Sequence, residues 1–299
     1  MVSLSRQIGF LLLKTGKELV RCGTKLAHPV SSEGLPTRSA DLTRTAVDGD
    51  TIDTVTPVFV LSTGRCGTLY LTDILDLCPD IDCNHARYPH LGRHARLAYE
   101  TNCCPPEVYR EVIRATRDEW ILSAHARGRI YVETNNRSTF LAPAVLDAYP
   151  RSRFIHLVRH PAKVVRSGAS RGWYLTGEEE RISQNELSRI VMADCEQWSR
   201  MSQTEKLAWL WNETNRFIEG FLSALPTSTW LRIRSEDLFE QESTVEEVLG
   251  FIGTRSVDWR SVKKLIGRVS NPQRRFTLPP HTEWAEEDRA LVRTHTPLA

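Results

Sequence analysis

Short apolar runs alternate with longer amphipathic segments from residue 57 onward. Residues 58–61 (VFVL) form an apolar run that is typical of a strand buried on both faces of a parallel sheet. Similar runs, and stretches with apolar positions at helical spacing, follow in turn. The strand-like runs are 129–133, 153–158 and 229–233, and the helical stretches are 107–124, 140–149, 161–171 and 205–225. This order predicts an α/β fold with a central, mostly parallel sheet flanked by helices in three layers.

Local signals mark some of the helix ends. Ser183 with Glu186, and Ser243 with Glu246, have the spacing of capping boxes, so each pair predicts the start of a helix. Gly253 suits the end of the helix that Ser243 would open, because glycine adopts the left-handed conformation that often follows a last turn.

The first 56 residues have a different pattern. Residues 1–26 have apolar positions at helical spacing and basic residues on the other face, which predicts an amphipathic helix. Its apolar run, residues 8–13, is too short to span a membrane. The helix would either pack on the domain or contact a membrane surface peripherally through residues 1–20. Residues 27–56 predict an exposed linker, and 57–299 a single domain.

Composition narrows the function classes. The 39 Lys and Arg residues nearly balance the 37 Asp and Glu residues, and the net charge of +2 argues against a nucleic-acid partner. None of the seven cysteines has the CxxC spacing of a zinc or redox site. Reduced thiols, and with them a cytoplasmic location, fit this pattern.

A glycine-containing turn follows the run at 58–61. Gly64 and Gly67 permit a tight backbone path between the predicted strand and the next helix, Arg65 adds a charge and Thr68 a hydroxyl. The amino terminus of a helix attracts anions through its unpaired N–H groups. No lysine precedes Thr68, so the turn is not a Walker A motif, and a nucleotide kinase or other NTPase becomes the less favoured alternative. The turn suits a phosphate-like group that binds without a metal.

A second basic site is expected at the end of the run 153–158. Residues 148–177 contain no acidic residue and six basic ones, Arg151, Arg153, Arg159, Lys163, Arg166 and Arg171. Arg159 stands at the carboxyl end of the predicted strand, where open α/β sheets bind ligands. Ser167 lies eight residues further on, in the predicted helix. Two anion sites at neighbouring strand ends indicate a ligand with two phosphate-like groups.

These two segments together resemble a known family. TGRCGT (63–68) followed by RFIHLVRHPAKVVRSGASRGWY (153–174) resembles the sulfotransferases that use 3′-phosphoadenosine 5′-phosphosulfate (PAPS), with their P-loop-like fold. Further segments resemble bacterial members, and the resemblance extends from 57 to 295. These segments are YVETNNRSTFL (131–141), EKLAWLWNETNRFI (205–218), RSEDLF (234–239) and 271–284.

The resemblance implies a donor, its binding residues and no metal. PAPS would be the co-substrate, and its 5′-phosphosulfate would be held by Arg65, Cys66, Gly67, Thr68 and Leu69. Arg159 and Ser167 would bind the 3′-phosphate, with Arg274 and Arg275 as further candidates.

The resemblance is weakest at the catalytic base. The family often has a glutamate where this chain has Ala86. His85 is the first candidate for the base, since imidazole accepts protons near neutral pH, and Glu133 at the end of a predicted strand is the second. His90 and His94 are weaker candidates. If no group replaces the glutamate, the chain would be an inactive relative that only binds the nucleotide.

The acceptor is not specified by these motifs. A hydroxyl or amine of a carbohydrate, a lipid or another small molecule, or a protein tyrosine, fits the resemblance equally well. Residues 87–106 and 175–182 are expected to shape the acceptor pocket, because similar scaffolds vary there.

Overall fold

The computed structural model describes residues 52–85, 88–101, 104–175, 189–254, 256–267 and 278–297. All of these residues belong to one compact unit, Gly49–Ala299. The predicted helix at 1–26, the first part of the predicted linker and the Ser183–Glu186 pair lie outside the described residues. Ile52 and Val55, at the end of the predicted linker, are buried in the core, so the packed unit begins before residue 57.

A parallel sheet of five strands forms the centre of this unit. The strands are β1 (Val58–Leu61), β2 (Ile81–Asn84), β3 (Ile130–Glu133), β4 (Arg153–Val158) and β5 (Trp230–Arg234). Their order is β2-β3-β1-β4-β5, and every neighbouring pair is parallel. β1 is therefore central, and its carboxyl end lies between those of β3 and β4, where the crevice of such a sheet is expected.

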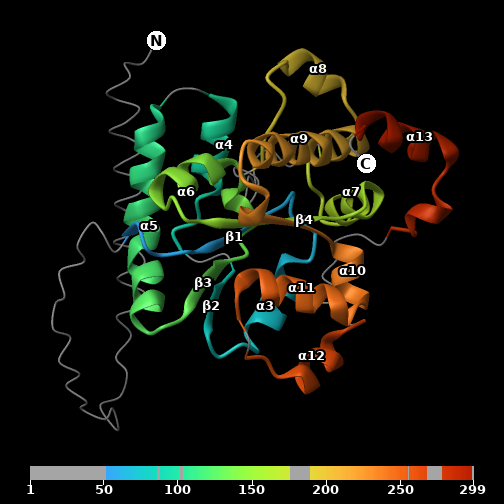
Figure 1. Cartoon of the computed structure of the whole chain (residues 1–299). Coiled ribbons are helices and arrows are strands. Elements are labelled where there is room, and N and C mark those ends of the chain that lie inside the picture. The colour runs from blue at the N-terminus through green and yellow to red at the C-terminus, as the bar shows by residue number, and fades with distance from the viewer. Residues whose placement is uncertain are drawn as a thin grey trace, which may run out of the picture. The chain divides into compact units, whose positions relative to one another are not determined.

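Helices cover both faces of the sheet (Figure 1). On one face lie α3 (Thr68–Leu75), α10 (Ser235–Glu240), α11 (Glu242–Ile252) and α12 (Trp259–Leu265). On the other face lie α5 (Pro106–Ala126), α6 (Ala142–Ala148), α7 (Pro161–Ala169) and α9 (Gln203–Ser223). The remaining described elements are α4 (Gly92–Glu100), α8 (Cys195–Arg200), α13 (Glu286–His295) and the short 3-10 helices η1 (Asn136–Leu141), η3 (Thr227–Thr229) and η4 (His281–Glu283). The predicted three-layer α/β architecture is confirmed.

The alternation of side chains along β1 divides the core into two layers. Val58 and Val60 pack against α3 and α11, whereas Phe59 and Leu61 pack against α5 and α6. Both sets are fully buried, so the strand has no polar face, which explains its uninterrupted apolar run.

The helix-end predictions had mixed outcomes. Gly253 ends α11 with φ 97°, as predicted. The Ser243–Glu246 pair does not open that helix, because α11 already begins at Glu242. A complete capping box instead opens α9, where the Ser202 hydroxyl and the Glu205 carboxylate each accept a backbone N–H of the other residue.

None of the helices in the described ranges has both the length and the apolar character that crossing a bilayer would need.

A buried histidine in β4 gives the fold a specific pH dependence. His156 is 1% exposed, and its Nε2 lies 2.8 Å from the Asn215 side-chain oxygen, while the Asn215 amide donates to the Trp211 carbonyl. Burial lowers the pKa of His156 from 6.5 to about 4. The unfolded chain therefore takes up a proton at this residue between pH 6.5 and about 4, whereas the folded chain stays neutral.

We predict that the wild type loses about 3 kcal/mol of unfolding free energy to His156 as pH falls from 7 to 4. His156→Gln keeps an amide that bonds Asn215 but does not titrate, so this variant should lose correspondingly less. Chemical denaturation at a series of pH values measures both slopes, and exposed His125→Gln is the matched control, with the wild-type slope. Equal slopes for wild type and His156→Gln would contradict the prediction.

Candidate functional site

Three residues in the turn between β1 and α3 have a left-handed backbone conformation. Gly64, Arg65 and Gly67 have φ of 79°, 61° and 84°. A Cβ on Gly67 would lie 2.5 Å from the Phe239 ring, and one on Gly64 would lie 2.8 Å from the Asn136 amide. Glycine is therefore required at both positions by conformation and by space.

The first turn of α3 faces this loop without a side-chain cap. Gly67 is the residue before the helix, and no side chain bonds the amino-terminal N–H groups. Since these groups have no acceptor within the helix, they offer an anion site at the loop.

Three arginines meet at the same loop. Arg159, just after β4, donates to the Arg65 carbonyl at 2.8 Å. The Ser167 hydroxyl on α7 accepts from Arg65 Nε at 3.0 Å and from Arg171 Nη1 at 3.2 Å. Burial and the charges of Arg171 and Arg159 lower the pKa of Arg65 to about 10. Buried Arg159 Nε has no hydrogen-bond partner. This cluster of positive charge is thus arranged for an anion that would relieve its repulsion.

The arginine cluster opens into a cavity of about 350 Å³. Six residues predicted for the site line it, namely Arg65, Gly67, Thr68, Leu69, His85 and Arg159. The described lining holds five arginines and no Asp or Glu, so the cavity is strongly positive.

Two other residues predicted to bind the sulfuryl donor, Cys66 and Ser167, are not part of the cavity lining. Cys66 is buried, and its Sγ is 3.1 Å from the Thr63 hydroxyl. Burial raises the pKa of this thiol, which keeps it protonated. Ser167 supports Arg65 through the hydrogen bond described above. Arg274, Arg275 and Ala86 lie outside the described residues.

His85 reaches the cavity from the end of β2. Its Nδ1 lies 3.0 Å from the Thr134 hydroxyl. Burial lowers the pKa of His85, and the charges of Arg137 and Arg65 act in the same direction, so the ring is neutral at pH 7. A neutral imidazole can accept a proton. His90 instead packs on the Tyr88 ring, and His94 lies within α4.

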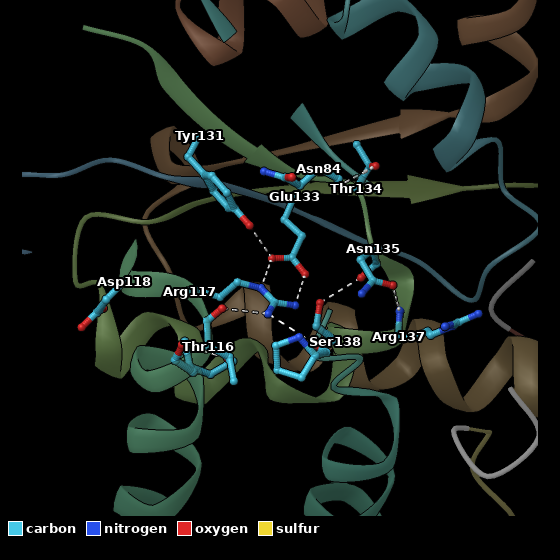
Figure 2. Close-up of polar contacts among 12 residues, drawn as sticks. Asn84, Thr116, Arg117, Asp118, Tyr131, Glu133, Thr134, Asn135, Arg137 and Ser138 are labelled. Atoms are coloured by element: carbon cyan, nitrogen blue, oxygen red, sulfur yellow. Dashed lines mark hydrogen bonds and ion pairs between the residues drawn. The ribbon is translucent and has the colours of Figure 1, made fainter. Parts of the chain in front are cut away.

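Glu133, the second candidate for the base, faces a different layer. Figure 2 shows its carboxylate between Tyr131 and Arg117. Arg117 donates to it through Nε at 2.6 Å and Nη2 at 2.9 Å, and the Tyr131 hydroxyl donates at 2.9 Å. Arg117 and Glu133 are 0% and 1% exposed. The partner of Glu133 therefore comes from α5 and not from the basic segment 148–177. Glu133 is also not part of the cavity lining.

Sequence reasoning missed several residues of the lining. Asn135, Asn136 and Arg137 follow β3 and line the cavity beside His85. The rule that ligands bind at the carboxyl ends of strands could have found this polar run. Arg189, stacked 4.4 Å above the Trp173 ring, had no such signal, because the sequence predicts no strand directly before it.

No group of three or more His, Cys, Asp and Glu side chains within the described ranges is arranged to hold a metal ion.

An arginine-lined cavity beside a glycine turn, at the carboxyl edge of a parallel sheet, is suited to an anionic ligand in an α/β protein. The model of the sulfotransferase family matches residues 57–258, more than half of the chain. The chain therefore belongs to the sulfotransferase family. Sequence comparison with curated proteins finds no match.

Solved structures of bacterial sulfotransferases are similar to the chain. Sulfotransferase STF1 from Mycobacterium tuberculosis is 12% identical, with 84% of this chain and 78% of that chain covered and a TM-score of 0.46. STF9 from Mycobacterium avium is 14% identical, with 82% and 76% covered and a TM-score of 0.46. A sulfotransferase from Alicyclobacillus acidocaldarius is 16% identical, with 80% and 94% covered and a TM-score of 0.42.

The Arg117–Glu133 pair predicts a structural effect of substitution. Glu133→Gln leaves the buried Arg117 charge without its counter-ion, so we expect a loss of about 3–5 kcal/mol in unfolding free energy. Replacing both residues, with Arg117→Met and Glu133→Leu, should cost less than the single change. Chemical denaturation measures both losses.

The exposed ion pair of Glu196 with Arg200 supplies the control, because Glu196→Gln should change stability by less than about 1 kcal/mol. A Glu133→Gln variant that stays as stable as the wild type but loses turnover would instead identify Glu133 as the base.

Proposed function

We propose that the chain transfers a sulfuryl group from PAPS to a hydroxyl or amine of an acceptor. The proposal depends on the convergence of Arg65, Arg159 and Arg171 at the turn before the uncapped start of α3. Two neighbouring anion sites fit a donor with a 5′-phosphosulfate and a 3′-phosphate.

The proposed donor contacts follow from the positions of these groups. The N–H groups of residues 65–69 and the Arg65 guanidinium would hold the phosphosulfate, and Arg159 with Ser167 would hold the 3′-phosphate. The unpartnered Arg159 Nε and the repulsion among the three arginines fit such an anion. Arg274 and Arg275 remain further candidates for the 3′ side.

His85 is the group we propose for proton transfer. The ring would take the proton of the acceptor hydroxyl while the acceptor oxygen forms its bond to sulfur and the bond from sulfur to the 5′-phosphate oxygen breaks. The negative charge then moves onto the leaving bisphosphate, where the arginines stabilise it. The rest of catalysis is positioning, since the cavity holds the two reactants in one orientation.

Two alternatives are less well supported. A nucleotide kinase would need the Walker lysine, which the turn lacks, and the family match argues for sulfuryl transfer. An inactive nucleotide-binding relative would need no base, yet a neutral histidine lines the cavity despite Ala86. The acceptor stays open among carbohydrates, lipids and other small molecules.

Donor recognition is testable at Arg159. Arg159→Ala should weaken binding of 3′-phosphoadenosine 5′-phosphate by about 2 kcal/mol, the usual cost of a lost charge-assisted hydrogen bond. Binding of adenosine 5′-phosphosulfate, which lacks the 3′-phosphate, should weaken less, because only the hydrogen bond from Arg159 to the Arg65 carbonyl is lost for this ligand. Calorimetry measures both affinities.

Arg153→Ala is the matched control, because Arg153 begins the same strand and stacks on Phe251, away from the cavity lining. This variant should bind both nucleotides as the wild type does. If Arg159→Ala weakens both ligands equally, the 3′-phosphate assignment fails.

The role of His85 is testable by kinetics. His85→Ala should lower kcat about 10²- to 10⁴-fold, the range for loss of a general base, with donor affinity nearly unchanged. Because the pKa of His85 is lowered, the wild-type rate should fall only below the ordinary histidine range as pH decreases, and this acid limb should vanish in the variant. Rates of labelled sulfuryl transfer across pH measure both effects. A variant with wild-type kcat would rule His85 out.

A further inference from the structure

The orientation of His85 depends on a buried chain of threonine hydroxyls. Thr134 directly follows Glu133 in β3, so its side chain points to the opposite face of the sheet, toward α3. There its Oγ1 lies 2.7 Å from Thr72 Oγ1 and 3.0 Å from His85 Nδ1. The Thr72 hydroxyl in turn donates to the Thr68 carbonyl at 2.9 Å, one turn back in the helix. Thr134 is fully buried and Thr72 nearly so.

The number of hydroxyl protons in this series of hydrogen bonds determines which ring nitrogen of His85 is protonated. The Thr68 carbonyl can only accept, so the single hydroxyl proton of Thr72 belongs to that contact. The proton between Thr72 and Thr134 must then come from Thr134. Thr134 has no second proton to give, so the proton in its contact with His85 comes from Nδ1 of the ring.

The opposite assignment leaves one close contact without a proton. If Thr134 donated to the ring, Thr72 would have to donate to Thr134, and the Thr72 hydroxyl would then face the Thr68 carbonyl at 2.9 Å with two sets of lone pairs. The Asn84 carbonyl does not change the count. If the Thr134 hydroxyl donates to this carbonyl, at 3.3 Å, it still has no proton left for the ring, and Nδ1 must again supply the proton of their contact (Figure 2).

We propose that Thr134, held by Thr72, is a positioning residue that accepts the Nδ1–H of His85 and so leaves Nε2 as the proton acceptor at the cavity. This inference rests on the proposed role of His85 as base, but the protonation state it assigns to the ring exists without donor or acceptor. Fixing the tautomer matters because a histidine held with its proton on the wrong nitrogen cannot act as the base.

Charged groups from three elements shift the pKa of the His85 ring. Arg65 in the β1–α3 turn and Arg137 in η1 disfavour a proton, whereas Asp73 in α3 favours one. The threonine chain itself carries no charge. Substitutions of Thr72 and Thr134 should therefore change the tautomer and the rate more than they change the position of the acid limb.

The first measurement is nuclear magnetic resonance of the protein with ¹⁵N-labelled histidine, without nucleotide, at a pH above the titration of His85. The ¹⁵N shifts and the couplings to the ring C–H protons distinguish the two neutral tautomers, and His85→Ala assigns the signals. We expect Nδ1–H and a bare Nε2 for His85 in the wild type. An Nε2–H tautomer would overturn the proposal.

The second measurement compares variants of the two threonines. Thr134→Val keeps the side-chain shape and removes the hydroxyl, so kcat should fall about 10- to 100-fold through loss of orientation, while the KM for the donor stays nearly constant. Thr134→Ser should restore most of the rate. Thr72→Val removes one acceptor of the Thr134 proton and leaves the ring and the Asn84 carbonyl, so the share of the Nε2–H tautomer should rise without a change in His85 itself.

Thr116→Val is the matched control. The Thr116 hydroxyl bonds only carbonyls of its own helix, α5, so neither the tautomer nor the rate should change. Thermal melts show whether each variant folds. Wild-type kcat and tautomer in folded Thr134→Val would overturn the proposal. If the wild type has the Nδ1–H tautomer but His85→Ala keeps full activity, the proposed base is refuted and the threonine chain is a purely structural feature.

Discussion

Two adjacent backbone carbonyls, those of Arg65 and Cys66, join the parts of the sheet that form the site. The Arg65 carbonyl accepts from Arg159 at the end of β4, and the Cys66 carbonyl accepts from the Ser235 hydroxyl at the start of α10 at 2.6 Å. The same hydroxyl lies 3.0 Å from the Val158 carbonyl. Three chain segments distant in sequence are thereby fixed around one turn. The left-handed backbone of this turn directs its carbonyls toward these donors and the N–H groups of α3 toward the cavity.

The placement of acidic residues shows which positive charges the fold neutralises. Arg117, which is buried and not part of the cavity lining, has Glu133 as its counter-ion, and Lys163 on α7 has Glu236 at 3.1 Å. The described cavity lining has no carboxylate at all. Keeping Arg65 and Arg159 close together therefore costs stability, which the rest of the core must offset. An anionic ligand gains the same electrostatic energy on binding, because these charges are already assembled and partly desolvated.

The sequence predicted the sheet best where burial is complete. β1 is apolar throughout, β4 is buried from Phe154 to Val158, and both match their predicted bounds. β2 (IDCN) is a half-buried edge strand with one aliphatic residue and was missed. Both segments that meet at the arginine cluster could be predicted as basic segments, because they follow strand ends in the order of the chain. The role of Glu133 could not be predicted, because its partner Arg117 lies in a helix of the other layer. The alternation of side chains in β3 decides that outcome: Glu133 pairs with α5, and the next residue, Thr134, meets α3.

Helix α3 has two functions in the proposed reaction. Its amino terminus faces the phosphosulfate site, and Thr72, one turn later, supports Thr134 and through it His85. The distance between the proposed base and the donor loop is thus determined within one helix and the two strands beside it. Arg137 and Arg189, by contrast, reach the cavity from a 3-10 helix and a loop. Residues on such segments can change without altering the geometry between the proposed donor site and base, which fits a scaffold that serves different acceptors.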